Sequence, residues 1–246
     1  MYAILKKKYS QNFLIDKNIQ KKICRLISSR NLNILEIGPG DGRLTDHILQ
    51  FEPRELTLIE IDKDLIDLLN KKFSKNKNVK VINEDILNYH LIENFDLIIS
   101  NLPYNISSQV LVKICLMQHL PINLILMFQK EFAERLISKK LNSLNSLVGC
   151  FYDINTCISV SKNCFRPVPR IDSTVLLFKR RNEILLKRNE IDNFIEFKRI
   201  LFSHKRKTLK NILRDFGLNQ NKFDLSLRVE EISLQELLRI FRETNL

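Results

Sequence analysis

The sequence predicts an α/β domain built on a mostly parallel sheet, followed by a small all-helical domain. Up to Arg180, apolar runs rich in Ile, Leu and Val alternate with longer amphipathic stretches. Continuous apolar strands separated by helices are typical of a parallel sheet that is covered on both faces. From Asp192 to Leu246, apolar residues recur at steps of three and four, which indicates helices. We therefore expect one domain at residues 1–182 and a second at residues 183–246.

The individual elements follow from the apolar runs in chain order. Strands are expected at Asn33–Ile37, Leu56–Ile61, Val79–Asn83, Phe95–Ser100 and Asn123–Phe128. Helices are expected between them, for example at Leu44–Gln50 and Lys63–Phe73. Asn155–Ser161 and Ser173–Lys179 indicate an antiparallel pair at one edge of the sheet. In the helical region, Ser233 and Glu236 fit a capping box, which predicts a helix that begins after Ser233.

The chain of 246 residues is strongly basic, with 40 Lys and Arg against 28 Asp and Glu and a formal net charge of +12. A charge of this sign favours a polyanionic partner, and nucleic acid first. The alternative is a solvated basic surface that binds no partner.

Other broad classes find little support in the composition. The most apolar stretch, Leu111 to Phe128, contains charged, polar and proline residues, so we expect no membrane span. The N-terminal residues MYAILKKKYSQNF lack the apolar segment of a signal peptide, which favours a cytoplasmic protein. The five cysteines form no Cys-x-x-Cys pair and the four histidines are scattered, so we expect reduced thiols and no metal site.

Three of the five glycines, Gly38, Gly40 and Gly42, fall within the segment LEIGPGDGRLT, between a predicted strand and a predicted helix. A loop of this kind brings backbone close to a nucleoside ligand at the carboxyl ends of the strands. A phosphate-binding loop would need Gly-Lys-Ser/Thr, which is absent, and a dinucleotide fingerprint would space the glycines differently. The alternative is a tight turn without a ligand.

Carboxylates follow three of the predicted strands. Glu60 ends the second strand, where it can accept both hydroxyls of a ribose, and Asp85 follows the third, where it can meet an adenine edge. Glu36 ends the first strand, where it can help to hold an amino-acid ammonium group. Carboxylates around a ligand suit a cation and disfavour a pyrophosphate. Together these features resemble the S-adenosylmethionine loop of class I methyltransferases, which implies a Rossmann-like fold.

The segment SNLPYN follows the predicted strand Phe95–Ser100 and looks like the Asn/Asp-Pro-Pro-Tyr motif of amino methyltransferases. The exocyclic amine of adenine is a poor nucleophile, because its lone pair is delocalised into the ring. The Asn101 side-chain oxygen and the Leu102 carbonyl can accept its two hydrogens and turn the lone pair toward a methyl donor. Pro103 fixes the backbone, and Tyr104 offers a flat face on which a splayed base stacks. The alternative is a surface turn with a buried tyrosine.

Seven motifs occur in the order found in ribosomal RNA adenine dimethyltransferases: YSQNFLID, EIGPGDGRLT, LIEID, NLPYNIS, FQKEFAERL, FRPVPRIDST and HKRKTLKNIL. The resemblance runs from about Tyr9 to Ile240 and is greatest to the bacterial enzymes that act on the small ribosomal subunit. It implies S-adenosylmethionine-dependent dimethylation of two adjacent adenosines in the 3′-terminal hairpin loop of 16S rRNA. It also implies a monomer whose partner is 16S rRNA within the small subunit or its precursor.

The resemblance further assigns roles to individual residues. It implies donor contacts at Asn12, Leu14, Gly38, Glu60, Asp85 and Asn101. It suggests that Phe165 covers the second face of the target base, the alternative being that Phe165 packs in a proline-rich turn. Two departures concern RNA contacts: Ser10 stands where the family has glycine, and Asn142 to Asn145 replace a basic segment.

Lys198 to Arg214 contains seven Lys or Arg and no acidic residue. We expect HKRK, His204 to Lys207, at a bend between helices, with Lys205, Arg206, Lys207 and Lys210 on RNA phosphates. The alternative for this cluster is a solvated helix face.

For the whole chain, two other functions stay open: a large-subunit methyltransferase of the macrolide-resistance type, and a non-catalytic RNA-binding assembly or transcription factor on the same fold.

Overall fold

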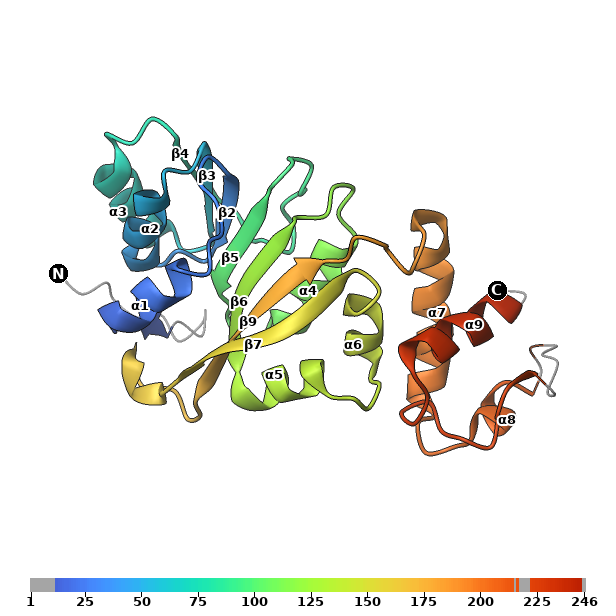
Figure 1. The fold of residues 1–246 in the computed structure, drawn as a ribbon. Helices are drawn as coiled ribbons and strands as arrows, with labels where there is room; N and C mark the ends of the chain where they lie inside the picture. The colour runs from blue at the N-terminus through green and yellow to red at the C-terminus, as the bar shows by residue number, and fades with distance from the viewer. Residues whose placement is uncertain (1–11, 215, 217–221, 245–246) are drawn as a thin grey trace. The chain divides into compact units, whose positions relative to one another are not determined.

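The computed structural model describes residues 12–214, 216 and 222–244. Its central sheet has seven strands in the order β4-β3-β2-β5-β6-β9-β7. They are β2 (Asn33–Ile37), β3 (Glu55–Glu60), β4 (Val79–Asn83), β5 (Leu97–Asn101), β6 (Asn123–Gln129), β7 (Tyr152–Val160) and β9 (Ser173–Arg180). The sheet runs through the middle of the view in Figure 1.

The strands from β4 to β6 are parallel, and β9 is antiparallel to β6. From β2 the chain passes to β3 and β4 on one side, and later to β5 and β6 on the other. The direction of winding therefore reverses between β2 and β5. In open α/β sheets, ligands bind outside the carboxyl ends of the strands at this switch point.

Helices flank the sheet and bury its apolar strands. They are α1 (Lys17–Cys24), α2 (Arg43–Ile48) with the 3₁₀ turn η2 (Leu49–Phe51), α3 (Lys63–Phe73), α4 (Ser107–Cys115) and α5 (Lys130–Ile137). Asp16 and Asp62 cap α1 and α3: the Asp16 side chain accepts the N–H groups of Asn18 and Ile19, and the Asp62 side chain accepts the N–H of Asp64. One core cluster joins residues of α1, α2, α3 and the central strands.

A small second sheet fixes the start of the described chain. The strands β1 (Phe13–Leu14) and β8 (Phe165–Arg166) pair antiparallel, with Leu14 opposite Phe165. The 3₁₀ turn η3 (Lys162–Cys164) precedes β8, and the carbonyl of Cys164 accepts the N–H of Ile15 at 2.8 Å.

The chain divides into two compact units, residues 1–133 with 154–180, and residues 134–153 with 181–246. Residues 134–153 thus group with the C-terminal part of the chain, although they precede β9 in sequence. The single domain boundary at residues 182/183 stays a prediction.

Within the described residues, no helix is both long and apolar enough to cross a membrane.

The second unit is built mainly from helices. They are α6 (Ser143–Val148), the 3₁₀ turn η4 (Arg188–Glu190), α7 (Ile191–Ser203), α8 (Leu209–Ile212) and α9 (Leu234–Glu243). Phe241 of α9 packs against Phe194 and Phe197 of α7, with ring centroids 5.2 and 5.5 Å apart. Arg242 pairs with Glu190 at 2.8 Å, and this contact holds the pKa of Glu190 below its ordinary value.

The prediction that the chain from Asp192 to Leu246 is almost wholly helical is wrong for residues 223–233, before α9. There the backbone carbonyls of Leu225 and Leu227 accept the N–H groups of Lys210 and Leu209, both at 2.8 Å. These contacts satisfy the free donors at the start of α8 and leave the stretch in turns. Asp224 also accepts hydrogen bonds from Ser226, a local alternative to helix formation.

The Asn142–Asn145 segment, which departs from the family pattern, forms a capping box at the start of α6. The Asn142 side chain accepts the N–H groups of Leu144 and Asn145, and the Asn145 side chain accepts the N–H of Asn142. Asn145 also donates to the carbonyls of Ser138 and Lys140. This segment therefore begins a helix and closes the loop before it. The other departure, Ser10, lies outside the described residues.

Candidate active site

A cavity of about 280 Å³ lies at the carboxyl ends of the strands around the switch point. It brings together most residues for which the sequence predicts a role at the site. Its lining includes Asn12, Leu14, Glu36, Gly38, Gly40, Glu60, Asp85, Asn101, Leu102, Pro103 and Tyr104. Phe165 is absent from this lining.

All three loop glycines adopt positive φ, at 66° for Gly38, 61° for Gly40 and 73° for Gly42. Side chains are strained in this region, which explains the clustering of glycine. A Cβ at Gly40 would stand 2.7 Å from the Phe13 ring, whereas a Cβ at Gly38 would meet no atom within 4 Å. The loop is thus closely packed beneath Gly40 and open at Gly38, where it faces the cavity.

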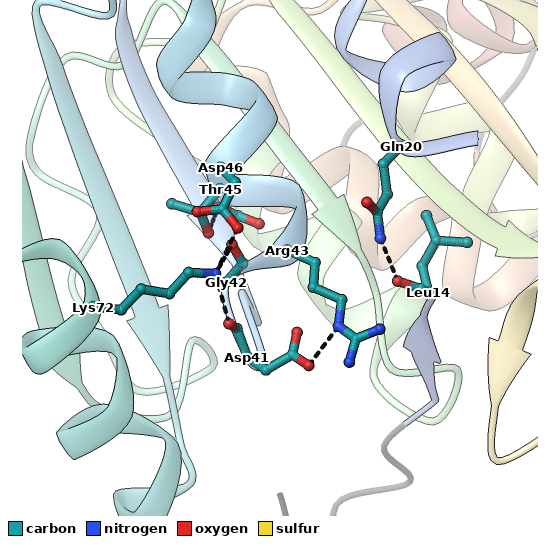
Figure 2. Close-up of polar contacts among 9 residues, drawn as sticks. Leu14, Gln20, Asp41, Gly42, Arg43, Thr45, Asp46 and Lys72 are labelled. Carbon is teal, nitrogen blue, oxygen red and sulfur yellow. Dashed lines mark hydrogen bonds and ion pairs between the residues drawn. The ribbon is translucent and has the colours of Figure 1, made fainter. Parts of the chain in front are cut away.

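Lys72, in the last turn of α3, holds the same loop from its outer side (Figure 2). Its ammonium donates to the carbonyls of Asp41 and Gly42, at 3.1 and 2.8 Å, and to the Asp46 carboxylate at 2.7 Å. Arg43 in turn pairs with the Asp41 side chain at 2.7 Å. These contacts fix the carbonyls of Asp41 and Gly42 on the outer side of the loop.

Glu60 is buried at the end of β3 and faces the loop. Its carboxylate accepts the N–H groups of Gly40, Ile61 and Asp62 at 2.9–3.1 Å. Burial raises the pKa of Glu60, and the three hydrogen bonds oppose that rise. Asp85 lies across the cavity, where its side chain accepts the N–H of Leu87 at 2.9 Å.

Glu36 is the most deeply buried acid of the cavity, with 1% of its surface exposed. Thr45 of α2 donates its hydroxyl to the carboxylate at 2.7 Å. Burial is the main reason that the pKa of Glu36 rises to about 8. A buried acid of this kind favours a cationic ligand group, because a nearby positive charge stabilises its ionised form.

The segment Asn12–Leu14 forms one wall of the cavity and is tied down at both ends. The carbonyl of Asn12 accepts the side-chain amide of Asn101 at 2.9 Å. The carbonyl of Leu14 accepts the amide of Gln20 at 2.6 Å, and Gln20 is 2% exposed (Figure 2). Since Asn101 donates through its nitrogen, its side-chain oxygen is the atom available to accept a substrate hydrogen.

The residues after β5 form a short loop with a fixed backbone. The carbonyl of Pro103 accepts the N–H of Ile106 and the hydroxyl of Ser107, both at 3.2 Å. Tyr104 is half-buried, and its hydroxyl lies 3.0 Å from the Ser173 hydroxyl. The loop therefore holds an amide, a backbone carbonyl and an aromatic ring beside the glycine loop.

Phe165 is fully buried within the core cluster and lies opposite Leu14 in the small sheet. This position favours the alternative that it packs in the core, so we leave it out of the base contacts proposed below.

In the second unit, Lys205, Arg206 and Lys207 are exposed in the turn between α7 and α8, and Lys210 is exposed in α8. The predicted bend between helices is thus confirmed.

Sequence analysis missed three residues that shape the cavity. Gln20 and Lys72 are polar residues of ordinary helices, and nothing in their local sequence shows which carbonyls they meet. Ile61 lines the cavity and is 41% exposed. Ile61 was expected as the last residue of a strand, and a single exposed apolar residue is common on protein surfaces, so the sequence held no signal for its place in the cavity wall.

The sheet order, the antiparallel strand β9 and the glycine loop at the switch point define a class I methyltransferase fold. Solved structures agree. A dimethyladenosine transferase from Plasmodium falciparum is 25% identical, with a TM-score of 0.81 over 94% of this chain and 97% of that one. The 23S rRNA methyltransferase ErmE is also 25% identical, with a TM-score of 0.75 over 95% of this chain and 100% of that one.

The chain belongs to the ribosomal RNA adenine dimethylase family, whose model matches residues 3–245. Two relatives are named ribosomal RNA small subunit methyltransferase A. The protein from Mycoplasmopsis pulmonis (strain UAB CTIP) is 37% identical over 97% of this chain and 98% of its own length. The one from Pelagibacter ubique (strain HTCC1062) is 37% identical over 99% of this chain and 98% of its own length. The chain is therefore an rRNA methyltransferase.

Proposed function

We propose that this enzyme dimethylates the exocyclic amino groups of two adjacent adenosines in the 3′-terminal hairpin loop of 16S rRNA, with S-adenosylmethionine as methyl donor. The observation that carries the proposal is the meeting of Asn101, Pro103 and Tyr104 with the glycine loop in one cavity. The names of the relatives at 37% identity favour the small subunit as substrate.

The residues of the cavity fit S-adenosylmethionine by their chemistry. The donor carries a positive sulfonium and an ammonium group, and the cavity is lined by the carboxylates of Glu36, Glu60 and Asp85. We assign Glu60 to the ribose hydroxyls, Asp85 to the adenine edge and Glu36 to the ammonium. The open space at Gly38 leaves room for the ligand beside the backbone. The donor supplies an electrophilic methyl group when it is bound.

The protein contributes alignment to the reaction. The Asn101 oxygen and the Leu102 carbonyl accept the two amine hydrogens of adenine, which directs the nitrogen lone pair toward the methyl group. The Tyr104 ring holds the base by stacking. No strong general base is needed, because the proton leaves after the methyl group has moved. Catalysis then depends on proximity and on the fixed dipoles of the loop.

The structural likeness to ErmE favours a second candidate, methylation of 23S rRNA. The two candidates are separated by incubating the enzyme with labelled donor and with unmethylated small or large subunits, then mapping the modified nucleotides. Label at two adjacent adenosines of 16S rRNA supports the main proposal, and label confined to 23S rRNA supports the second. Donor binding without transfer to either subunit would support a non-catalytic role. A cytoplasmic, monomeric enzyme stays a prediction.

Replacing Lys205, Arg206 and Lys207 with alanine should weaken binding to small subunits and leave donor affinity unchanged. If the three side chains contact phosphates, the negative slope of log K against log salt should become shallower by about two to three units, because fewer counterions are released on binding. Titration at several salt concentrations measures the slope.

A matched control removes three exposed lysines near the end of α3, Lys71, Lys75 and Lys77. Circular dichroism monitors folding of both variants. If the two triple variants show the same affinity and salt slope as the unmodified protein, the turn between α7 and α8 is only a solvated surface.

Donor affinity should rise with pH through the neutral range and level off near pH 8, because the buried Glu36 with its pKa of about 8 must lose a proton to pair with the ammonium. In the ligand-free protein the raised pKa of Glu36 lowers the free energy of unfolding over part of the pH range. The unfolded chain releases this proton near its ordinary pKa of 4.5, so the stability contributed by Glu36 falls as pH rises from there to about 8.

Calorimetry of donor binding in two buffers of different ionisation enthalpy measures the released proton. Glu36→Gln should abolish both the proton release and the pH dependence. An unchanged pH dependence in this variant would assign the released proton to another group.

A further inference from the structure

The hydroxyl groups of Tyr104 and Ser173 share a hydrogen bond with their oxygens 3.0 Å apart. Tyr104 lies in the loop after β5, and Ser173 is the first residue of β9. The strand β6 lies between β5 and β9 in the sheet. Neighbouring strands are about 4.8 Å apart, so the tyrosine side chain passes over the end of β6 to reach its partner.

Ser173 is a firm anchor for this contact. It is fully buried and lies opposite Gln129 in the ladder between β6 and β9. The residue before it is held twice, because the Asp172 carbonyl accepts the N–H of Lys130 at 3.0 Å and its side chain accepts the N–H of Lys162 at 2.9 Å. Ser173, near the end of the FRPVPRIDST motif, thus supplies a hydroxyl that is fixed in place beside the carboxyl end of β6.

We infer that Ser173 is a positioning residue, which holds the Tyr104 ring in the orientation that receives the target adenine. The inference rests on the proposed function, in which Tyr104 stacks on the base. Tyr104 lines the cavity while its hydroxyl is engaged by Ser173, so the ring face is the part of the side chain that remains for a ligand.

The state of the hydroxyl agrees with this role. Burial raises the pKa of Tyr104, and the hydrogen bond to Ser173 opposes the rise only in part. The hydroxyl therefore stays protonated near neutral pH.

A double-mutant cycle with Ser173→Ala, Tyr104→Phe and the combined variant tests the inference. Each single change removes one hydroxyl and keeps the ring. Each should raise KM for unmethylated small subunits by about 2- to 10-fold, the effect of one lost hydrogen bond, with kcat and donor affinity unchanged. The combined variant should be no worse than either single one. Ser108→Ala, which removes an exposed hydroxyl in α4, is the matched control.

Three results would overturn the inference: additive effects of the two changes, a fall in kcat with Tyr104→Phe alone, or a loss of donor affinity with Ser173→Ala. The second would show that the hydroxyl acts in the chemical step, and the third that the change acts through the donor site or the fold. The unmodified enzyme is assayed on the same subunits. If it transfers no methyl group to them, the proposed function fails, and a failure confined to the cycle concerns Ser173 alone.

Discussion

Replacing Asn101 with alanine should lower the rate of methyl transfer by two to three orders of magnitude, on the order of the loss seen when one aligned hydrogen-bonding group is removed from an active site. In the proposed mechanism the side-chain oxygen accepts an amine hydrogen as the nitrogen lone pair forms its new bond, so its contribution should be largest in the transition state. Single-turnover kinetics with saturating donor and subunits isolates this step.

The same change breaks the bond from the Asn101 amide to the Asn12 carbonyl. Donor affinity must therefore be measured beside the rate, because the Asn12–Leu14 wall is also part of the donor cavity. A matched control is Asn88→Ala, which removes an exposed amide outside the cavity lining. A near-normal single-turnover rate for Asn101→Ala would exclude the proposed alignment mechanism.

Replacing Glu60 with alanine should weaken donor binding by roughly 1.5–3 kcal/mol, the range for hydrogen bonds to a charged group. Two effects combine. In the proposed site the donor ribose would lose its carboxylate partner, and the N–H groups of Gly40, Ile61 and Asp62 lose their acceptor. Affinity for small subunits should change much less. Calorimetry with the donor and subunit titration give the two values.

The control for this variant is Glu55→Ala, which removes an exposed carboxylate at the opposite end of the same strand. Because Glu60 also supports the loop, chemical denaturation should accompany the binding measurement and show whether the fold is weakened. An unchanged donor affinity in a folded Glu60→Ala protein would remove Glu60 from the donor site.

The sheet could be predicted from sequence because its information is local. Asn33–Ile37 and Val79–Asn83 are strands with the expected bounds. Ile34 to Ile37 are buried, as expected for a strand that is covered on both faces of a parallel sheet. The two strands expected as a pair at one edge are neighbours there, as β9 and β7, whereas the antiparallel pairing of β9 with β6 was not predicted. The glycine loop was predictable for the same reason, because its positive φ angles select glycine residue by residue.

Contacts between distant parts of the chain could not be predicted in this way. Gln20 meets Leu14 and Lys72 meets the loop only because the packing of α1 and α3 brings them there. Phe165 was placed near the site by the resemblance to a family motif. Its burial in the core opposite Leu14 favours the packing alternative, and a role toward the target base stays a prediction.

The grouping of residues 134–153 with the C-terminal unit bears on how this protein can be recombined with its relatives. Within that unit, the Lys198 ammonium donates to the Ser143 carbonyl and the backbone N–H of Leu185 donates to the Cys150 carbonyl. In a chimaera joined at a single point near residue 182, the two partners of each contact would come from different proteins. A C-terminal unit transplanted from a relative must therefore carry its own counterpart of residues 134–153. The exchange then needs two more junctions than the single one near residue 182.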